Sequence, residues 1–321
     1  MLDKNQNLSF APINKAYGQV FRPDQLTLGL VLPLEAYPVG SEPTMKGHMK
    51  AAQLAESLGF AALWLRDVPF NVPSFGDPGQ IFDPFVYLGA LATATDRIAL
   101  GTASIVLPLR HPAHVAKAAA SADVLSDGRL LLGVASGDRP EEYPAMRQSF
   151  PDRGERFRDS VDYIRATATP YPKHESLQGH LPGDIDLLPK PSGSRLPLLI
   201  TGGSRQSPDW VAENGDGWMT YPRDAASQGR AVADYRNRLK ALGQPDKPVM
   251  QSLYVDLLED PNAPARPIHL GFQSGSNFLR RYLAEIRELG MNHVALNLRF
   301  NQAAIEPTLK RLADTILPEF S

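Results

Sequence analysis

The 321-residue chain contains no cysteine. Disulfides, thiolate metal sites and a cysteine nucleophile are therefore excluded, and the composition fits a reducing compartment. The sequence also has no run of 18 apolar residues, and its first residues lack the apolar segment of a secretory signal. We therefore expect a cytoplasmic protein with no membrane-spanning helix.

An excess of charge of either sign is missing as well. Lys and Arg number 33 and Asp and Glu number 35, which gives a formal net charge of −2. Proteins that hold nucleic acid through its phosphates need a basic excess, so we expect no nucleic-acid partner. Three catalytic motifs are also absent: the GxSxG turn of serine hydrolases, the GxGxxG dinucleotide loop and the phosphate loop GxxxxGKS or GxxxxGKT.

Short apolar runs alternate with longer amphipathic segments along the chain. Continuous apolar strands are typical of a parallel sheet that helices cover. Eight strand–helix units predict an α/β protein, a (β/α)8 TIM barrel in one domain over residues 1–321, with a doubly wound open sheet as the alternative. The predicted strands are 26–33, 61–67, 98–108, 129–138, 196–203, 217–222, 249–258 and 293–300.

Two segments interrupt this alternation and one precedes it. Residues 138–195 separate the fourth and fifth predicted strands and are too long for one crossover, so we expect an insertion that forms an ordered excursion or a lid. Residues 260–276 form a second, shorter loop insertion. Residues 1–25 precede the first strand as an N-terminal extension.

The active site of such a barrel is built at the carboxyl ends of its strands. These ends carry a polar rim: Glu35, Tyr37, Arg66, Asp67, Thr102, Ser104, Ser136, Asp138, Arg139, Gly202, Gly203, Ser204, Thr220, Tyr221, Asp256, Asn297 and Arg299. No histidine ends a strand, which disfavours a zinc or two-metal hydrolase, and we predict no metal site. His111 and His114 are more typical of a helix start than of a metal pair. Glu141 and Glu142 are more typical of solvated charges on a loop than of the two catalytic carboxylates of a glycosidase.

Residues 199–210, LITGGSRQSPDW, run from a strand through Gly-Gly-Ser into a helix start. Free amides at a helix start, and glycines that allow close approach, favour a phosphate site. A plain helix cap is the alternative. The third strand has small residues at its middle, GTAS (101–104), against which a flat group can lie, although a tight barrel interior needs small residues too.

Five segments occur in the order and at the spacing of one protein family. They are GFAALWLRD (59–67), IALGTASIVLPLRHP (98–112), SDGRLLLGVASGD (126–138), GERF (154–157) and ITGGS (200–204). The chain resembles the bacterial luciferase-like, flavin-dependent monooxygenases over nearly its whole length. It is most similar to a subgroup marked by RDVP (66–69), FGDPGQIFDP (75–84) and ASGDRP (135–140).

This resemblance implies that FMN binds at the carboxyl ends of the barrel strands. It implies a cis peptide bond between Ala103 and Ser104 that packs against the flavin ring. It places the flavin phosphate near the fourth-strand end and the turn after the fifth strand, with Arg205 as a further charge contact. The implied cofactor-binding residues are Ala103, Ser104, Ser136, Gly137, Gly203, Ser204 and Ser207.

Two positions depart from the luciferases. Ser136 stands where they carry an arginine, so the phosphate contacts differ. Val68 stands where they carry a histidine that serves the luciferase reaction. Asp67 and Arg66, beside Val68, are therefore the candidate catalytic residues, and a strand-end ion pair or barrel packing is the alternative for both.

The function implied by the resemblance is a monooxygenase that uses reduced FMN and O2 to oxygenate a small organic substrate. A separate flavin reductase is expected to supply the reduced FMN. A deazaflavin- or flavin-dependent hydride-transfer oxidoreductase is the first alternative, and a non-catalytic flavin-binding protein is the second. The resemblance also implies a homodimer, for which the alanine-rich helix 113–125 offers a small, closely packable face, with barrel packing as the alternative.

Overall fold

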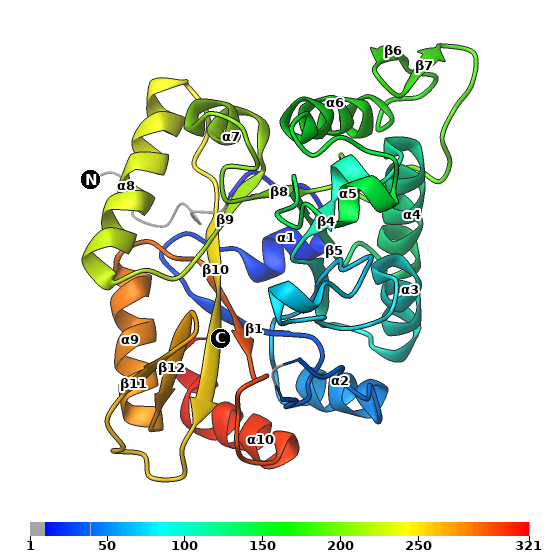
Figure 1. Ribbon diagram of the computed structural model, residues 1–321. Coiled ribbons are helices and arrows are strands. Elements are labelled where there is room, and N and C mark those ends of the chain that lie inside the picture. The colour runs from blue at the N-terminus through cyan, green and yellow to red at the C-terminus, as the bar shows by residue number, and fades with distance from the viewer. Residues whose placement is uncertain (1–9, 39, 321) are drawn as a thin grey trace, which may run out of the picture.

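The computed structural model describes residues 10–38 and 40–320. Eight strands pair in parallel and close on themselves in the order β1, β2, β3, β5, β8, β9, β10, β13 and back to β1. They are β1 (Thr27–Val31), β2 (Ala62–Leu65), β3 (Ala99–Thr102), β5 (Leu130–Ala135), β8 (Leu198–Thr201), β9 (Gly217–Thr220), β10 (Val249–Leu257) and β13 (His293–Asn297). The predicted (β/α)8 barrel is confirmed (Figure 1).

A helix follows each barrel strand and packs outside it (Figure 1). Several helices begin at a polar residue whose side chain accepts an N–H of the first turn, such as Asp83 before α3 and Asp224 before α8. Proline at the first helical position starts α3, α4 and α7. The helices are α2 (His48–Ser57), α3 (Pro84–Ala94), α4 (Pro112–Leu125), α6 (Arg153–Ala166), α7 (Pro208–Asn214), α8 (Ala225–Ala241), α9 (Ser276–Glu288) and α10 (Ile305–Thr315).

Shorter elements decorate this framework. They are α1 (Lys15–Val20), η1 (Pro73–Phe75), β4 (Ile105–Val106), η2 (Leu107–Leu109), α5 (Glu142–Ala145), β6 (Lys173–Ser176), β7 (Gly179–Pro182), β11 (Arg266–Ile268), β12 (Gly271–Ser274) and η3 (Leu317–Glu319). Among the described residues, no helix combines the length and the apolar character that crossing a bilayer requires.

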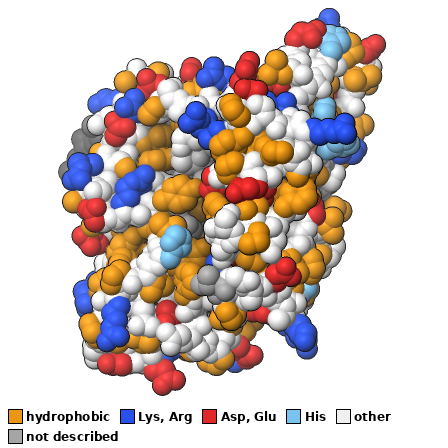
Figure 2. Space-filling model, viewed as in Figure 1, with side chains coloured by type: hydrophobic (Ala, Val, Ile, Leu, Met, Phe, Trp, Pro, Cys, Tyr) orange, Lys and Arg blue, Asp and Glu red, His pale blue; other side chains and the backbone are white. Residues whose placement is uncertain are grey.

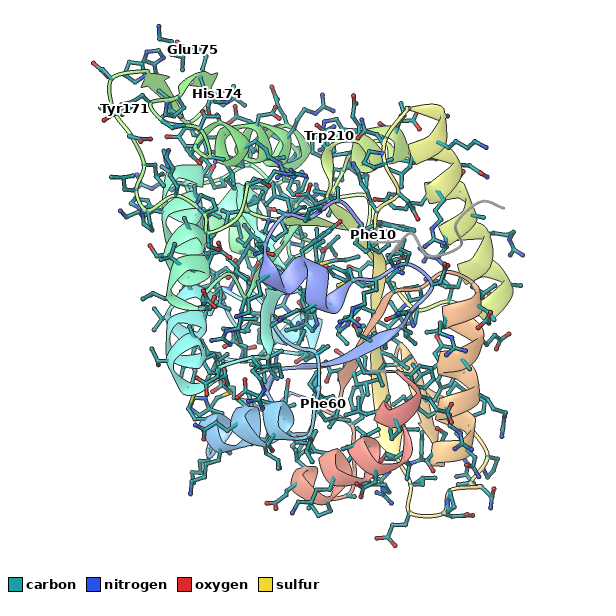
Figure 3. The ribbon with its side chains drawn as sticks, turned by 180° about the vertical axis from the view of Figure 1, so that it is seen from behind. Phe10, Phe60, Tyr171, His174, Glu175 and Trp210 are labelled. Carbon is teal, nitrogen blue, oxygen red and sulfur yellow. The ribbon has the colours of Figure 1, made fainter. Side chains whose placement is uncertain are left out.

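Helix α1 closes the amino-terminal end of the barrel. Its Ala16 N–H donates to Gly128 O at 2.9 Å, just before β5, and Tyr17 OH donates to Asp216 O at 2.6 Å, just before β9. Figure 3 shows α1 lying across this end. Figures 1 and 2 therefore view the opposite end, where the strands terminate. Residues 1–9 of the predicted N-terminal extension lie outside the described residues.

The segment 138–195 contains α5, α6 and the antiparallel β6–β7 hairpin. Helix α6 lies against α4 as the crossover helix after β5, whereas the hairpin projects at one corner of the molecule in both views (Figures 1 and 3). Residues 138–152, which lead from β5 to α6, are the part of the segment that starts at the end of a barrel strand. We therefore restrict the predicted lid to these residues.

Two large apolar clusters fill the fold, one between barrel and helices and one inside the barrel, and a third, small cluster consists of Val106, Leu109 and Tyr143. Trp64 occupies the interior and is fully buried. Gly101 faces it on the neighbouring strand, where an added Cβ would lie 2.3 Å from the indole ring. The small residues of the third strand therefore serve the barrel interior at this position.

His293 lies beside Trp64 in the same interior and is held as a neutral imidazole. Trp64 Nε1 donates to His293 Nε2 at 2.9 Å, so that nitrogen is an acceptor. Thr27 Oγ1 donates to Val20 O at 2.8 Å and lies 2.7 Å from His293 Nδ1, so Nδ1 carries the proton. Both ring nitrogens are thus satisfied without a charge, and burial lowers the pKa of His293 from 6.5 to about 3.

This histidine predicts a loss of stability in mild acid. Below pH 6.5 the unfolded chain binds a proton at His293 that the folded chain does not, so the free energy of unfolding falls until the folded pKa is reached. Between about pH 7 and about pH 4.5, the expected loss in the free energy of unfolding due to His293 is roughly 2–3 kcal/mol. Urea unfolding at both pH values measures it. His293→Gln should lose this pH dependence, whereas the exposed His114→Gln should keep it.

Candidate active site

The predicted cofactor residues lie at the carboxyl ends of three neighbouring strands, β3, β5 and β8. The peptide bond between Ala103 and Ser104 is cis, as the resemblance implies. The hydroxyl of Ser104 contacts the hydroxyl of Thr201, the last residue of β8. The third-strand end therefore directly adjoins the Gly-Gly-Ser turn.

The turn after β8 has an unusual backbone. Gly202, Ser204 and Arg205 adopt left-handed conformations, with φ of 54°, 43° and 62°. Such conformations are uncommon outside glycine, and successive N–H groups in them converge into a concave anion site. Among the described residues, the N–H groups of Gly203, Ser204 and Arg205 donate to no protein acceptor. A Cβ on Gly203 would find only Gln206 O, at 3.6 Å, so the turn is open on that side.

Arg205 belongs to this turn, and Arg153 lies beside it. Arg153, at the start of α6, donates to Gly137 O at 3.3 Å and to Phe150 O at 2.8 Å. Burial and the nearby positive charge of Arg205 lower the pKa of Arg153. Two guanidinium groups that repel each other at an open turn favour an anion between them.

Ser136 and Gly137 complete this end of the barrel from β5. Ser136 is 5% exposed, and its carbonyl accepts a hydrogen bond from Tyr143 OH. Gly137 has φ of 76°, and an added Cβ would lie 2.7 Å from the Tyr143 hydroxyl. Ser207 begins α7 and accepts the Trp210 N–H at 3.2 Å, so its side chain already serves as a helix cap. We name the turn 202–205 with Arg153, Ser136 and Gly137 the anion cradle.

Asp67, a predicted catalytic residue, is buried in an ion pair. Its carboxylate is 1% exposed and accepts from Arg110 Nε at 2.9 Å, from Arg110 Nη2 at 2.8 Å and from Val106 N–H at 3.1 Å. Arg110 also pairs with Asp83 at the start of α3. These contacts join the end of β2 to β4 and α3, and they favour a positioning role for Asp67 over proton transfer.

We expect Asp67→Asn to destabilise the protein by about 2–4 kcal/mol, because it leaves the Arg110 guanidinium without its buried charge partner. Chemical denaturation measures the loss. Asp127→Asn is the control, because the Asp127 side chain is 88% exposed and its surface ion pair with Lys15 should contribute little to stability. Unchanged stability in Asp67→Asn would contradict the positioning role.

Sequence reasoning missed a second buried acid, Asp77, which lies in the loop after β2. Its Oδ2 pairs with Arg66 Nη1 at 2.5 Å and with Arg299 Nη1 at 3.0 Å, and accepts Tyr254 OH at 3.3 Å. Its Oδ1 accepts Tyr37 OH at 2.9 Å. Burial by itself would raise the pKa of Asp77, but Arg66, a backbone N–H and Arg299 outweigh it and lower the pKa to about 2.

This mouth cluster, Asp77 with Arg66, Arg299, Tyr37 and Tyr254, draws its members from the ends of β1, β2, β10 and β13. The only sequence signal for Asp77 was the FGDPGQ segment, which marked a subgroup but gave no partner. The arginines and Tyr37 stood in the predicted polar rim. The fold alone shows that one loop carboxylate joins them.

Arg139 and Glu142 extend the mouth cluster from the β5 side. Arg139 Nη2 donates to Asp77 O at 3.0 Å, and its guanidinium lies 4.2 Å from the Phe75 ring centre. Glu142 is 2% exposed and stands 3.9 Å from Arg139 Nη1. The expectation that Glu141 and Glu142 are both solvated is therefore wrong for Glu142, and burial raises its pKa.

His111 serves as the N-cap of α4, accepting the Ala113 N–H at 3.2 Å. The expectation of a helix-start role is confirmed. Within residues 10–38 and 40–320, no group of three or more His, Cys, Asp or Glu side chains is placed to hold a metal ion.

The sequence profile of the luciferase-like monooxygenase family matches residues 27–301. The chain belongs to this family. An uncharacterised protein of Mycobacterium tuberculosis is 32% identical over 54% of this chain and 67% of its own length. The F420-dependent hydroxymycolic acid dehydrogenase of the same organism is 29% identical over 60% of this chain and 53% of its own length.

Solved structures of luciferase-like proteins share the fold. The monooxygenase RslO1 from Streptomyces bottropensis aligns with a TM-score of 0.77 at 20% identity, covering 92% of this chain and 100% of the other. An F420-dependent secondary alcohol dehydrogenase aligns with a TM-score of 0.76 at 17% identity, covering 92% and 99%. The family thus contains flavin-dependent monooxygenases and F420-dependent dehydrogenases, and its members are oxidoreductases.

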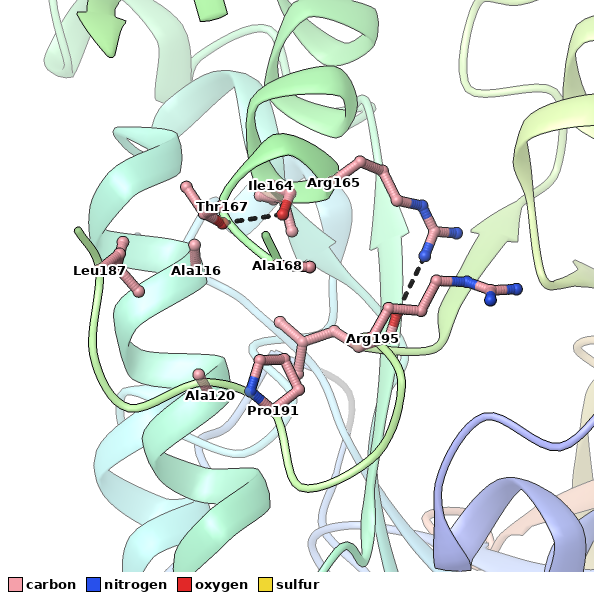
Figure 4. Close-up of a pocket in the computed structure, with 10 residues that line it drawn as sticks. Ala116, Ala120, Ile164, Arg165, Thr167, Ala168, Leu187, Pro191 and Arg195 are labelled. Atoms are coloured by element: carbon pink, nitrogen blue, oxygen red, sulfur yellow. Dashed lines mark hydrogen bonds between the residues drawn. The ribbon is translucent and has the colours of Figure 1, made fainter. Parts of the chain in front are cut away.

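A small cavity outside the barrel of this luciferase-like chain is not the site. It lies between α4, α6 and the segment leading to β8, with Ala116, Ile164 and Pro191 among its lining residues (Figure 4). Its volume of about 10 Å³ holds no more than one water molecule. The cavity is a local packing gap.

Proposed function

We propose that this luciferase-like enzyme uses reduced FMN and O2 to oxygenate a small organic substrate at the carboxyl end of the barrel. The observation that carries the proposal is the anion cradle. It combines free N–H groups of the turn 202–205 with the guanidinium groups of Arg153 and Arg205, beside the Ala103–Ser104 segment.

The residues of the cradle fit a flavin phosphate. A phosphate dianion accepts hydrogen bonds from backbone N–H groups and from arginine, and the cradle presents both. The two arginines take the place of the luciferase arginine that Ser136 replaces. Bound FMN would supply the redox chemistry with O2, while this chain holds the phosphate and supports the flavin ring on the third-strand end.

The loops at the carboxyl ends of the strands exclude water from the site. Phe70, Phe75 and Tyr221 are 41%, 43% and 46% exposed. Figure 2, which views this end, shows hydrophobic side chains gathered around the middle of the face. Closure of residues 138–152 over a bound flavin would bury such side chains and keep solvent from the reaction.

Hydride transfer with the deazaflavin F420 is the second candidate function. A 29% identical relative is an F420-dependent dehydrogenase, and a solved F420-dependent alcohol dehydrogenase has the same fold. Parallel binding titrations of reduced FMN and reduced F420, followed by measurement of O2 consumption, separate the two. Preference for F420 without O2 consumption would overturn the monooxygenase proposal.

We further propose that a separate reductase supplies the reduced FMN.

We also propose that two copies of the chain associate. Ala116, Ala119 and Ala120 of the predicted alanine face are buried within the chain, which favours the packing alternative for that face. Exposed apolar side chains lie instead at Val86 on α3 and Leu125 on α4, 74% and 64% exposed, on helices that pack together. We expect a dimer by light scattering and a monomer for the double variant Val86→Lys, Leu125→Lys; a wild-type monomer would contradict the proposal.

A further inference from the structure

Arg66 lies at the mouth of the barrel. It follows β2 and pairs with Asp77 of the mouth cluster. Asp77 also contacts Tyr254 of β10 and Arg139, which follows β5. The carboxylate partner of Arg66 therefore joins strands from different sides of the barrel, at the end where a substrate must approach.

The guanidinium of Arg66 is held at one end and uncommitted at the other. Only Nη1 takes part in a hydrogen bond among the described residues, to Asp77, and the side chain is 20% exposed. Asp77 is itself shared with Arg299, so a single carboxylate faces two guanidinium charges. Among these three side chains one positive charge is left over, and Nε and Nη2 of Arg66 are donors without a protein acceptor among the described residues.

The same edge binds a carboxylate elsewhere in this chain. Arg110 donates hydrogen bonds from Nε and Nη2 to the two carboxylate oxygens of Asp67, at 2.9 and 2.8 Å. This fork is the geometry in which arginine recognises a planar anion. In Arg66 the fork is positioned by Asp77 but has no protein acceptor among the described residues.

We propose that Arg66 is the anion-binding residue of the barrel mouth and that its Nε–Nη2 edge receives a planar anionic group, with Asp77 as the positioning residue. Two sources offer this chemistry: the carboxylate of an organic-acid substrate, and the anionic pyrimidine edge of a reduced flavin. Only the second source rests on the proposed function.

Calorimetric titration of the cofactor-free protein tests the first source. The probes are benzoate and hexanoate, each against its neutral amide. We expect each acid to bind roughly tenfold or more tightly than its amide, because charged hydrogen bonds are the stronger ones. Arg66→Gln should abolish the difference, Arg66→Lys should restore part of it, and Arg230→Gln, on the outer helix α8, should leave it unchanged.

The midpoint potential of the FMN-loaded protein tests the second source. A lower potential in Arg66→Gln than in wild type, without any acid–amide difference, assigns the anion to the reduced flavin. If Arg66→Gln does not fold by circular dichroism, Arg66→Lys carries both arms, with a weakened acid preference or a smaller potential shift expected. Equal binding of acids and amides together with an unchanged potential overturns the proposal. Failure of FMN to bind would overturn the proposed function alone, because the calorimetric arm uses no flavin.

Discussion

Replacing Arg153 and Arg205 together by glutamine should weaken FMN binding by roughly a hundredfold or more, since each charged hydrogen bond to a phosphate contributes about 1.5–3 kcal/mol. Arg205 lies in the open turn after β8 and Arg153 lies beside it, and their positive charges repel each other when no anion is bound. The double substitution removes the charge of the anion cradle, together with the hydrogen bonds of Arg153 to Gly137 O and Phe150 O. Fluorescence titration of FMN measures the affinity.

Riboflavin, which lacks the phosphate, is the matched ligand for this test. Its affinity should be the same in wild type and in the double variant. Arg230→Gln is the protein control, because Arg230 is an exposed arginine on α8 whose hydrogen bond goes to Ser227, outside the anion cradle. FMN affinity unchanged in the double variant would place the phosphate elsewhere.

Asp77→Asn should destabilise the protein by about 3–5 kcal/mol, because it leaves two nearly buried guanidinium groups without their shared counter-charge. Arg299 is 5% exposed at its side chain and Arg66 is 20% exposed. An asparagine also turns an N–H₂ group toward one of the donors that now share the carboxylate. Urea unfolding near neutral pH measures the loss, and the exposed Asp314→Asn is the control.

The pH dependence of this difference is fixed by the pKa of Asp77, which is lowered to about 2. A lowered carboxyl pKa contributes stability that is present above the unfolded pKa and is lost as the pH falls toward the folded one. The gap between wild type and Asp77→Asn should therefore narrow by roughly 2 kcal/mol between about pH 5 and about pH 2. A gap that stays constant over this range would show that Asp77 is not held as a carboxylate.

The fold was predictable because its signals are local. Most barrel strands are continuous apolar runs, and several helices carry their own capping residues, so the eight units and their order follow from the sequence. The packing of Trp64 against Gly101 is also indicated by the sequence, because a glycine inside an apolar strand predicts the close approach of a neighbour.

The candidate site was predictable only in part, because partner choice is a tertiary property. The sequence placed Asp67 at a strand end but did not show that Arg110 occupies both its oxygens. Asp77 lay in a motif with no assigned role, and the burial of Glu142 contradicted its loop setting. The alanines of α4 suited either an interface or barrel packing, and four of them, Ala116, Ala119, Ala120 and Ala122, are buried within the chain.

The central claim is that the carboxyl end of this barrel binds a reduced flavin through its phosphate. Anaerobic titration of the purified protein with reduced FMN, with reduced riboflavin in parallel, tests it most directly. We predict saturable binding of reduced FMN that is roughly a hundredfold tighter than that of riboflavin, and consumption of O2 when air is admitted. Equal affinity for the two flavins, or no binding of either, would contradict the claim.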